Sequence, residues 1–222
     1  MKRPRRLLVI ALALTIIVGV GVIGVPRLLG YGSPTPPYAA PGSGASMSIR
    51  KDSRQPVVIG QPVRLGVAPK VLRVYLDFHC PDCADFVKQY GSAIDQAVQD
   101  DRAQLAVYPL AVIDDGSAAA ANAFACAAEG GGAPEYLAGL SANPGLKWTD
   151  GQLIAVGDFA GLNFTPGFAT CVHDTSHRAW VDSMKGVAAA DGVSGTPAVF
   201  LGADRVDVAT LTPERLRALL QG

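Results

Sequence analysis

The sequence lacks an excess of either charge. Its 222 residues contain 19 lysines and arginines and 19 aspartates and glutamates, which gives a formal net charge of zero. A neutral balance gives no electrostatic reason to expect a nucleic-acid partner. No internal repeat is apparent either. The length suits one domain with appendages, or at most two small domains.

Cysteine and histidine are scarce, with four and three residues respectively. Zinc usually needs four ligands, and only one C-x-x-C pair is present, Cys80 and Cys83. The remaining candidate ligands, Cys126, Cys171 and His173, are spread thinly along the chain. We therefore expect no metal site and no cofactor. A redox couple is favoured at the C-x-x-C pair, with a structural disulfide and a metal half-site as alternatives.

Charge is also absent from residues 7–25, which form a run of 19 residues that is almost entirely apolar. At 1.5 Å per residue this run is just long enough to span a membrane as a helix. No small-residue cleavage site follows it, so we predict an uncleaved transmembrane anchor rather than a cleaved signal peptide. The four positive charges of residues 1–6 place that end in the cytoplasm. The rest of the chain would then lie in an extracytoplasmic, oxidising space.

Residues 26–50 are rich in proline, glycine and serine and are predicted to form a linker. Residues 51–222 would form one α/β domain with a helical insert at about 115–190. Within it, hydrophobic patterns and turn residues predict strands at 56–66, 70–78, 103–110, 198–202 and 204–208. The same reasoning predicts helices from Pro81 onward and at 117–128, 134–141, 149–162, 177–192 and 212–221.

The C-x-x-C pair lies where a predicted strand gives way to a helix. Pro81 suits the first helical turn, where its missing N–H costs nothing. The sulfur of Cys80 would face the unpaired N–H groups and the positive end of that helix, which stabilise a thiolate. Cys83, one turn later, suits the attack that resolves a mixed disulfide. A ring this short adds little chain-entropy stabilisation, which argues against a purely structural bond.

Two motifs carry a family resemblance: "DFHCPDC" at 77–83 and "GVSGTPAVF" at 192–200. From about residue 56 to its end, the sequence resembles the DsbA-like thiol-disulfide oxidoreductases of the thioredoxin superfamily, in their membrane-anchored actinobacterial form. The resemblance implies a thioredoxin-like fold with a helical insertion. It also implies that Pro197 is a cis-proline lying against the cysteine pair. Thr196 would present its backbone to a bound substrate chain.

The sequence departs from the family pattern around the cysteines. Many relatives carry an acid six residues before the first cysteine, where this sequence has Val74. Asp77 is the nearest upstream carboxylate, and it either replaces that acid or makes a strand-end hydrogen bond. Asp82, between the cysteines, would repel a nearby thiolate. His79 either offsets this repulsion when protonated or is a partly exposed side chain at the rim.

Cys126 and Cys171 remain outside the motif. In an oxidising compartment two such cysteines usually pair, and some actinobacterial relatives carry a comparable second disulfide. The bond would close a loop of 46 residues (126 to 171 inclusive), worth up to roughly 4 kcal/mol in the chain-entropy model. A second redox couple and two free buried thiols are the alternatives. His173 and His177 are expected to be polar surface residues, and Trp148 and Trp180 to be aromatics in the core or at its edge.

These patterns together predict a membrane-tethered enzyme, active outside the cytoplasm, that forms disulfides in exported proteins. Its expected partners are reduced exported proteins and a membrane reoxidant of the vitamin K epoxide reductase type, and we expect a monomer. One alternative is the same fold acting as a disulfide reductase or isomerase. Another is a non-catalytic thioredoxin-fold module that uses the groove to bind a partner.

Overall fold

A computed structural model describes residues 49–50, 53–61, 70–144 and 148–221. The predicted anchor at 7–25 and nearly all of the predicted linker lie outside these residues. Among the residues described, no helix is both long enough and apolar enough to cross a membrane.

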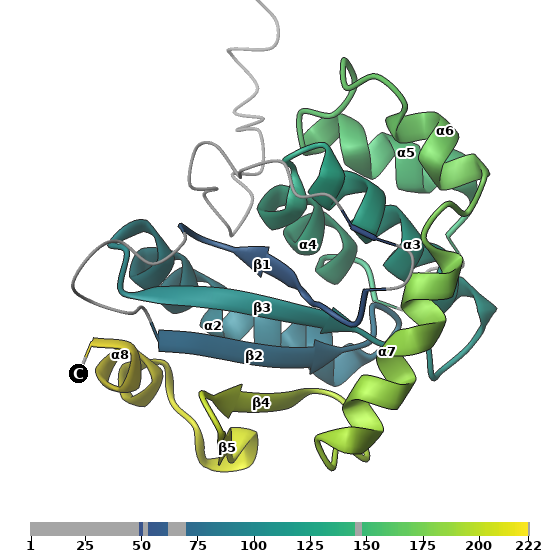
Figure 1. The fold of residues 1–222 in the computed structure, drawn as a ribbon. Coiled ribbons are helices and arrows are strands. Elements are labelled where there is room, and N and C mark those ends of the chain that lie inside the picture. Colours follow the sequence, from purple (N-terminus) through teal and green to yellow (C-terminus); the bar gives the residue numbers. More distant parts are fainter. Residues whose placement is uncertain (1–48, 51–52, 62–69, 145–147, 222) are drawn as a thin grey trace, which may run out of the picture. The chain divides into compact units, whose positions relative to one another are not determined.

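The centre of the domain is a five-stranded mixed sheet with strand order β1-β3-β2-β4-β5 (Figure 1). Strands β2 and β3 are parallel, while β1 with β3, β2 with β4, and β4 with β5 pair antiparallel. The middle strand β2 therefore has neighbours on both sides, and its second half is fully buried. The strands span Val57–Ile59 (β1), Lys70–Leu76 (β2), Ala103–Pro109 (β3), Ala198–Leu201 (β4) and Asp204–Val206 (β5).

Helices pack around this sheet, and those between β3 and β4 form the insert. In Figure 1, α3 to α6 gather as one group, and α7 leads the chain back toward β4. Helices α2 and α8 pack against each other. The helices span Pro81–Gln99 (α2), Asp115–Glu129 (α3), Ala133–Ser141 (α4), Asp150–Phe159 (α5), Phe168–His173 (α6), Arg178–Ala190 (α7) and Pro213–Gln221 (α8), with a 3₁₀ turn at Val208–Thr210.

This is the thioredoxin-like α/β fold with a helical insertion that the sequence predicts. Several boundaries differ from the prediction, and one short helix is additional. The strand expected at 56–66 is observed only at Val57–Ile59, because Gly60 turns the chain with φ +117°, and residues 62–69 lie outside those described. Strand β2 stops at Leu76, because a turn bond from the Cys80 N–H to the Asp77 carbonyl follows it. The helix expected at 149–162 ends at Phe159, and the short helix α6 was not predicted.

The core is contiguous between the sheet and the insert. Tyr75 of β2 stacks on Tyr108 of β3 with ring centroids 4.3 Å apart, and Phe78 meets Phe124 of α3 at 5.3 Å. Trp180 is completely buried, and Trp148 is buried as well, as predicted. Aromatic residues bury large apolar areas, so these contacts fix the insert against the end of β2, where the cysteines lie.

Candidate active site

Cys80 is the N-cap residue of helix α2. Its backbone is extended, with φ −80° and ψ 116°, and Pro81 occupies the first turn, as predicted. Cys83 follows one turn later, so both sulfurs lie near the helix N-terminus. Both cysteines are free thiols in this structure, and both are buried, Cys80 at 8% and Cys83 at 3% exposure. Pro81 and Asp82 are exposed to solvent between them.

The second motif lies directly against the first. The Thr196–Pro197 peptide bond is cis and precedes β4, the antiparallel neighbour of β2. The thiol of Cys80 donates to the Thr196 carbonyl oxygen at 3.5 Å. Thr196 and Pro197 are half-buried, so part of this turn faces solvent beside Cys80. The sheet thus brings together two motifs that are more than one hundred residues apart in sequence.

The surroundings of Cys83 favour its protonated form. Burial raises the pKa of the Cys83 thiol well above its ordinary value, and contact with the Cys80 thiol adds to the increase. A hydrogen bond from the Asp77 backbone and another from the Thr196 side chain oppose the increase but do not cancel it. A neutral Cys83 one turn inside the helix suits a resolving thiol rather than the attacking one.

Asp77 is fully buried, and its carboxylate accepts three backbone hydrogen bonds. Oδ1 accepts from the N–H of His79 at 2.9 Å, and Oδ2 accepts from Val112 at 2.9 Å and Ile113 at 3.2 Å. The carboxylate therefore joins the end of β2 to the loop that follows β3. Of the two roles considered for Asp77, this geometry matches the strand-end hydrogen bond. Val74, at the position of the family acid, is buried.

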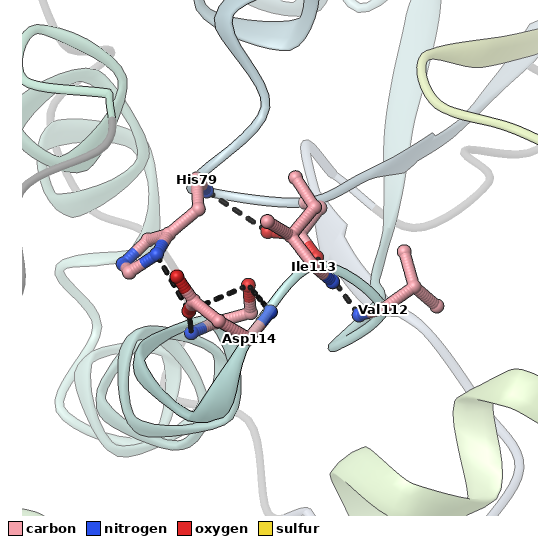
Figure 2. A network of polar contacts seen from close by, with 6 residues as sticks. His79, Val112, Ile113 and Asp114 are labelled. Atoms are coloured by element: carbon pink, nitrogen blue, oxygen red, sulfur yellow. Dashed lines mark hydrogen bonds and ion pairs between the residues drawn. The ribbon is translucent and has the colours of Figure 1, made fainter.

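One of the two expectations for His79 was a partly exposed position at the rim, and this expectation is wrong because the residue is buried. Its side chain is 2% exposed, and its Nδ1 lies 2.8 Å from Oδ1 of Asp114. In Figure 2 a dashed line joins the ring to this carboxylate. Asp114 caps helix α3 through a reciprocal pair of bonds with Ser117. Gly116 provides room for the imidazole, because a β-carbon there would lie only 2.3 Å from Cε1 of His79.

Sequence analysis did not single out Asp114 or Gly116. The capping pattern of Asp114 with Ser117 three residues later was readable in the sequence. Nothing in the sequence indicated that this cap would meet the residue before Cys80, because that contact depends on how the insert packs against the sheet.

The contact between Gly116 and His79 predicts opposite effects for two glycine substitutions. In a helix, Gly→Ala normally stabilises by about 0.5 to 1 kcal/mol. At Gly186, an exposed position in α7 with open space around it, we expect this gain. At Gly116 we expect a loss of about 1 to 3 kcal/mol instead, because the methyl group overlaps a buried ring. Urea unfolding of the two variants measures both; a gain at Gly116 would contradict the packing described.

The Asp114 carboxylate predicts an acid-dependent effect. The hydrogen bond with His79 lowers the pKa of Asp114 below its usual range. Stability from a lowered carboxyl pKa is present above the unfolded value of about 3.9 and is lost as the pH falls through the folded value. Asp114→Asn keeps a good helix cap but removes the charge. We expect it to lower the free energy of unfolding by about 0.5 kcal/mol at pH 6, since the carboxylate is half-exposed.

The same comparison at pH 3 should show a smaller difference between Asp114→Asn and the unmodified chain. Unfolding curves at pH 3, 4, 5 and 6 measure this convergence. A difference that stays constant over the whole range would show that the charge of Asp114 does not contribute.

Cys126 and Cys171 form a disulfide, with an S–S distance of 2.09 Å and Cα atoms 5.9 Å apart. The bond joins α3 to α6 inside the insert, and the alternative of two free thiols is therefore wrong for this structure. His173 is exposed, as predicted. The prediction for His177 is wrong, because it is only 4% exposed. The helix expected to start there begins at Arg178, and the histidine before it points into the insert beside Glu129.

Comparisons with known proteins agree with this geometry. A family model described as thioredoxin matches residues 52–222. Among solved structures, the reduced DsbG of Mycobacterium tuberculosis is similar with a TM-score of 0.64 and 21% identity, over 75% of this chain and 86% of that one. The oxidised DsbA of the same organism is similar with a TM-score of 0.64 and 22% identity, over 75% of this chain and 91% of that one. MdbA of Actinomyces oris, a thiol-disulfide oxidoreductase, is similar with a TM-score of 0.61 and 22% identity, over 69% of this chain and 81% of that one.

A search of curated proteins found no match. At these identities the solved structures establish the fold, and the family model covers well over half of the sequence. With a thioredoxin-like sheet, a C-P-x-C pair at the start of α2 and a cis-proline beside it, the chain belongs to the thioredoxin family.

Proposed function

We propose that this protein is a thiol:disulfide oxidoreductase that forms disulfides in exported proteins through Cys80 and Cys83. The observation that carries the proposal is the position of Cys80. It lies at a helix N-terminus, against the carbonyl of the cis-proline turn, with a buried neutral thiol one turn behind it. The similarity to solved thiol-disulfide oxidoreductases supports the same chemistry.

The reaction would run in two exchanges. A substrate thiolate attacks Cys80 Sγ of the Cys80–Cys83 disulfide, and Cys83 leaves with the bonding electrons. Because burial raises its pKa, the Cys83 thiolate takes up a proton and does not reverse the step readily. A second substrate thiolate then attacks the substrate sulfur of the mixed disulfide. Cys80 is released as a thiolate, the substrate is oxidised and the pair is reduced.

Substrate binding would use the surface around Cys80. The half-buried turn at Thr196 and Pro197 offers backbone for an extended chain to pair with, in the way strands add to an open edge. On the loop held by Asp77, Val112 and Ile113 are 54% and 50% exposed. Exposed apolar side chains on this loop suit the binding of unfolded chains, which present apolar residues with little regard to sequence.

We also propose an extracytoplasmic location, with residues 7–25 as the anchor and residues 1–6 in the cytoplasm. The disulfide between Cys126 and Cys171 supports an oxidising compartment. A membrane protein of the vitamin K epoxide reductase type would accept two electrons from the reduced Cys80–Cys83 pair. The protein would act as a monomer.

One observation favours the reverse direction. Asp82 is exposed between the cysteines, and a carboxylate there disfavours the thiolate and hence the reduced form that makes an oxidant strong. A reductase or isomerase of the same fold is therefore the second candidate.

Oxidative refolding distinguishes these candidates. The oxidised full-length chain, in detergent, is mixed with one equivalent of a reduced unfolded protein that contains several cysteines, and disulfides are counted by mass spectrometry after alkylation. We expect one disulfide transferred per chain. Failure to transfer, together with rapid reduction of insulin by the reduced chain, would favour the reductase. A Cys80→Ser/Cys83→Ser chain that keeps its cellular role would favour a binding module.

A further inference from the structure

The disulfide of the insert lies in polar surroundings. Asn122, one turn before Cys126 on α3, is 1% exposed, and its Nδ2 lies 3.9 Å from Cys126 Sγ and 3.5 Å from the Cys171 carbonyl oxygen. The Oδ1 of the same amide accepts the backbone N–H of His177 at 2.8 Å. A hydrogen-bond donor therefore already faces the sulfur of Cys126.

A buried imidazole lies beside the same bond. A ring nitrogen of His177 and the sulfurs of Cys126 and Cys171 all lie within 4.8 Å of one another. Among the described residues neither ring nitrogen has a well-aligned hydrogen-bond partner, although Nε2 lies 3.1 Å from Oε2 of Glu129. Buried polar groups in native proteins are nearly always satisfied. Nε2 has the Glu129 carboxylate beside it, and Nδ1 can pair with a group that forms in another state of the site.

The two cysteine residues differ in exposure. Cys126 is 3% exposed, in the middle of the insert, whereas Cys171 on α6 is only partly buried. An incoming thiolate would therefore reach Cys171 first. The sulfur that must then leave is Cys126, the one that faces Asn122 and lies beside His177.

We propose that Cys126–Cys171 is a second thiol-reactive disulfide, attacked at Cys171, whose leaving sulfur at Cys126 is stabilised by His177 and Asn122. The reactant is a thiol of another protein or a small thiol. Its thiolate bonds to Cys171 Sγ, the S–S bond breaks, and Cys126 departs with the bonding electrons. A second thiolate attacks the incoming sulfur and frees Cys171. Two thiols are oxidised to one disulfide, and the insert gains two thiols.

The stabilised leaving group makes this bond easier to reduce than a purely structural one. The Asn122 amide and the His177 ring beside Cys126 stabilise the departing sulfur, which speeds its departure and favours the reduced form at equilibrium. The site lies in the insert, and its reactivity does not depend on the function proposed for Cys80 and Cys83.

The test uses full-length Cys80→Ser/Cys83→Ser protein in detergent, so that only the insert pair reacts. The protein is equilibrated with mixtures of reduced and oxidised glutathione, alkylated, and the state of Cys126 and Cys171 is read by peptide mass spectrometry. We expect reversible reduction within the range of these mixtures while circular dichroism shows the folded state. A bond that stays intact until the chain unfolds would overturn the proposal.

Variants of the neighbours test the assigned cause. His177→Gln should shift the equilibrium at least 10-fold toward the disulfide, and Asn122→Ala should shift it in the same direction. His173→Gln, an exposed histidine of the same insert, is the matched control and should leave it unchanged. Equal behaviour of His177→Gln and His173→Gln would overturn the role of the imidazole. If His177→Gln does not fold, the equilibrium of the chain without that substitution still decides the proposal.

Discussion

Replacing Cys80 with serine should abolish disulfide transfer to a reduced unfolded protein, by about 10³-fold or more, because the sulfur that forms the mixed disulfide is gone. The loss should not come from unfolding. Serine is close in size to cysteine, and Cys80 contributes no disulfide to the reduced structure. Transfer is measured as substrate disulfides per chain over time, and circular dichroism checks the fold of the variant.

The Cys83→Ser variant is the matched comparison for Cys80→Ser. It retains the sulfur expected to attack but removes the one expected to resolve. Incubated with a substrate that contains an activated mixed disulfide, this variant should accumulate a covalent adduct at Cys80, while Cys80→Ser should form none at Cys83, which is buried and whose pKa burial raises. An adduct that forms through Cys83 and not Cys80 would reverse the two roles.

Replacing Asp77 with alanine should lower the free energy of unfolding by about 3 kcal/mol or more, through the loss of its three backbone partners. The N–H groups of His79, Val112 and Ile113 would lose the acceptor that holds them. The bond to His79 is buried, and leaving its N–H unpaired costs roughly 1 to 3 kcal/mol, while the two bonds to Val112 and Ile113 are part-buried and each add about 1 kcal/mol. Because these bonds join the end of β2 to the loop after β3, disulfide transfer should fall as well. Urea unfolding and the transfer assay measure the two effects.

Asp85→Ala is the control for this substitution. Asp85 is an exposed carboxylate on α2, close to the cysteines in sequence, and its removal should change stability by less than about 0.5 kcal/mol. If Asp77→Ala were as mild as Asp85→Ala, the buried carboxylate would not be what holds the loop. Asp77→Asn should be intermediate in stability, since its amide oxygen still accepts hydrogen bonds.

Local sequence signals were sufficient to predict those parts of the site that are built from residues close together in the chain. The strand that leads to Cys80, the proline in the first turn of α2 and the buried second cysteine all follow from residues 70–90. The resemblance to a known family supplied what spacing alone left open, namely that Thr196–Pro197 is a cis bond beside the cysteines. The structure places Cys80 and the Thr196 carbonyl in contact.

Local signals failed where the contact crosses from the sheet to the insert. His79 is buried because Asp114 and Gly116 of α3 receive its ring, and His177 is buried because α3, α6 and α7 close around the disulfide. Hydrophobic periodicity predicts that these helices exist, but it does not predict which face of one helix packs against which face of another. From sequence alone, a histidine next to a turn is therefore predicted to lie on the surface, and only the packing of the helices shows that it is buried.

The measurement that tests the central claim most directly is the reduction potential of the Cys80–Cys83 pair, equilibrated in glutathione buffers with peptide mapping to follow Cys126 and Cys171 separately. A disulfide donor needs a stabilised reduced form, and the account predicts a potential of about −120 to −180 mV. A value near −270 mV would show a pair that donates electrons instead, and it would contradict the proposed direction. The absence of any reversible couple would contradict the oxidoreductase assignment itself.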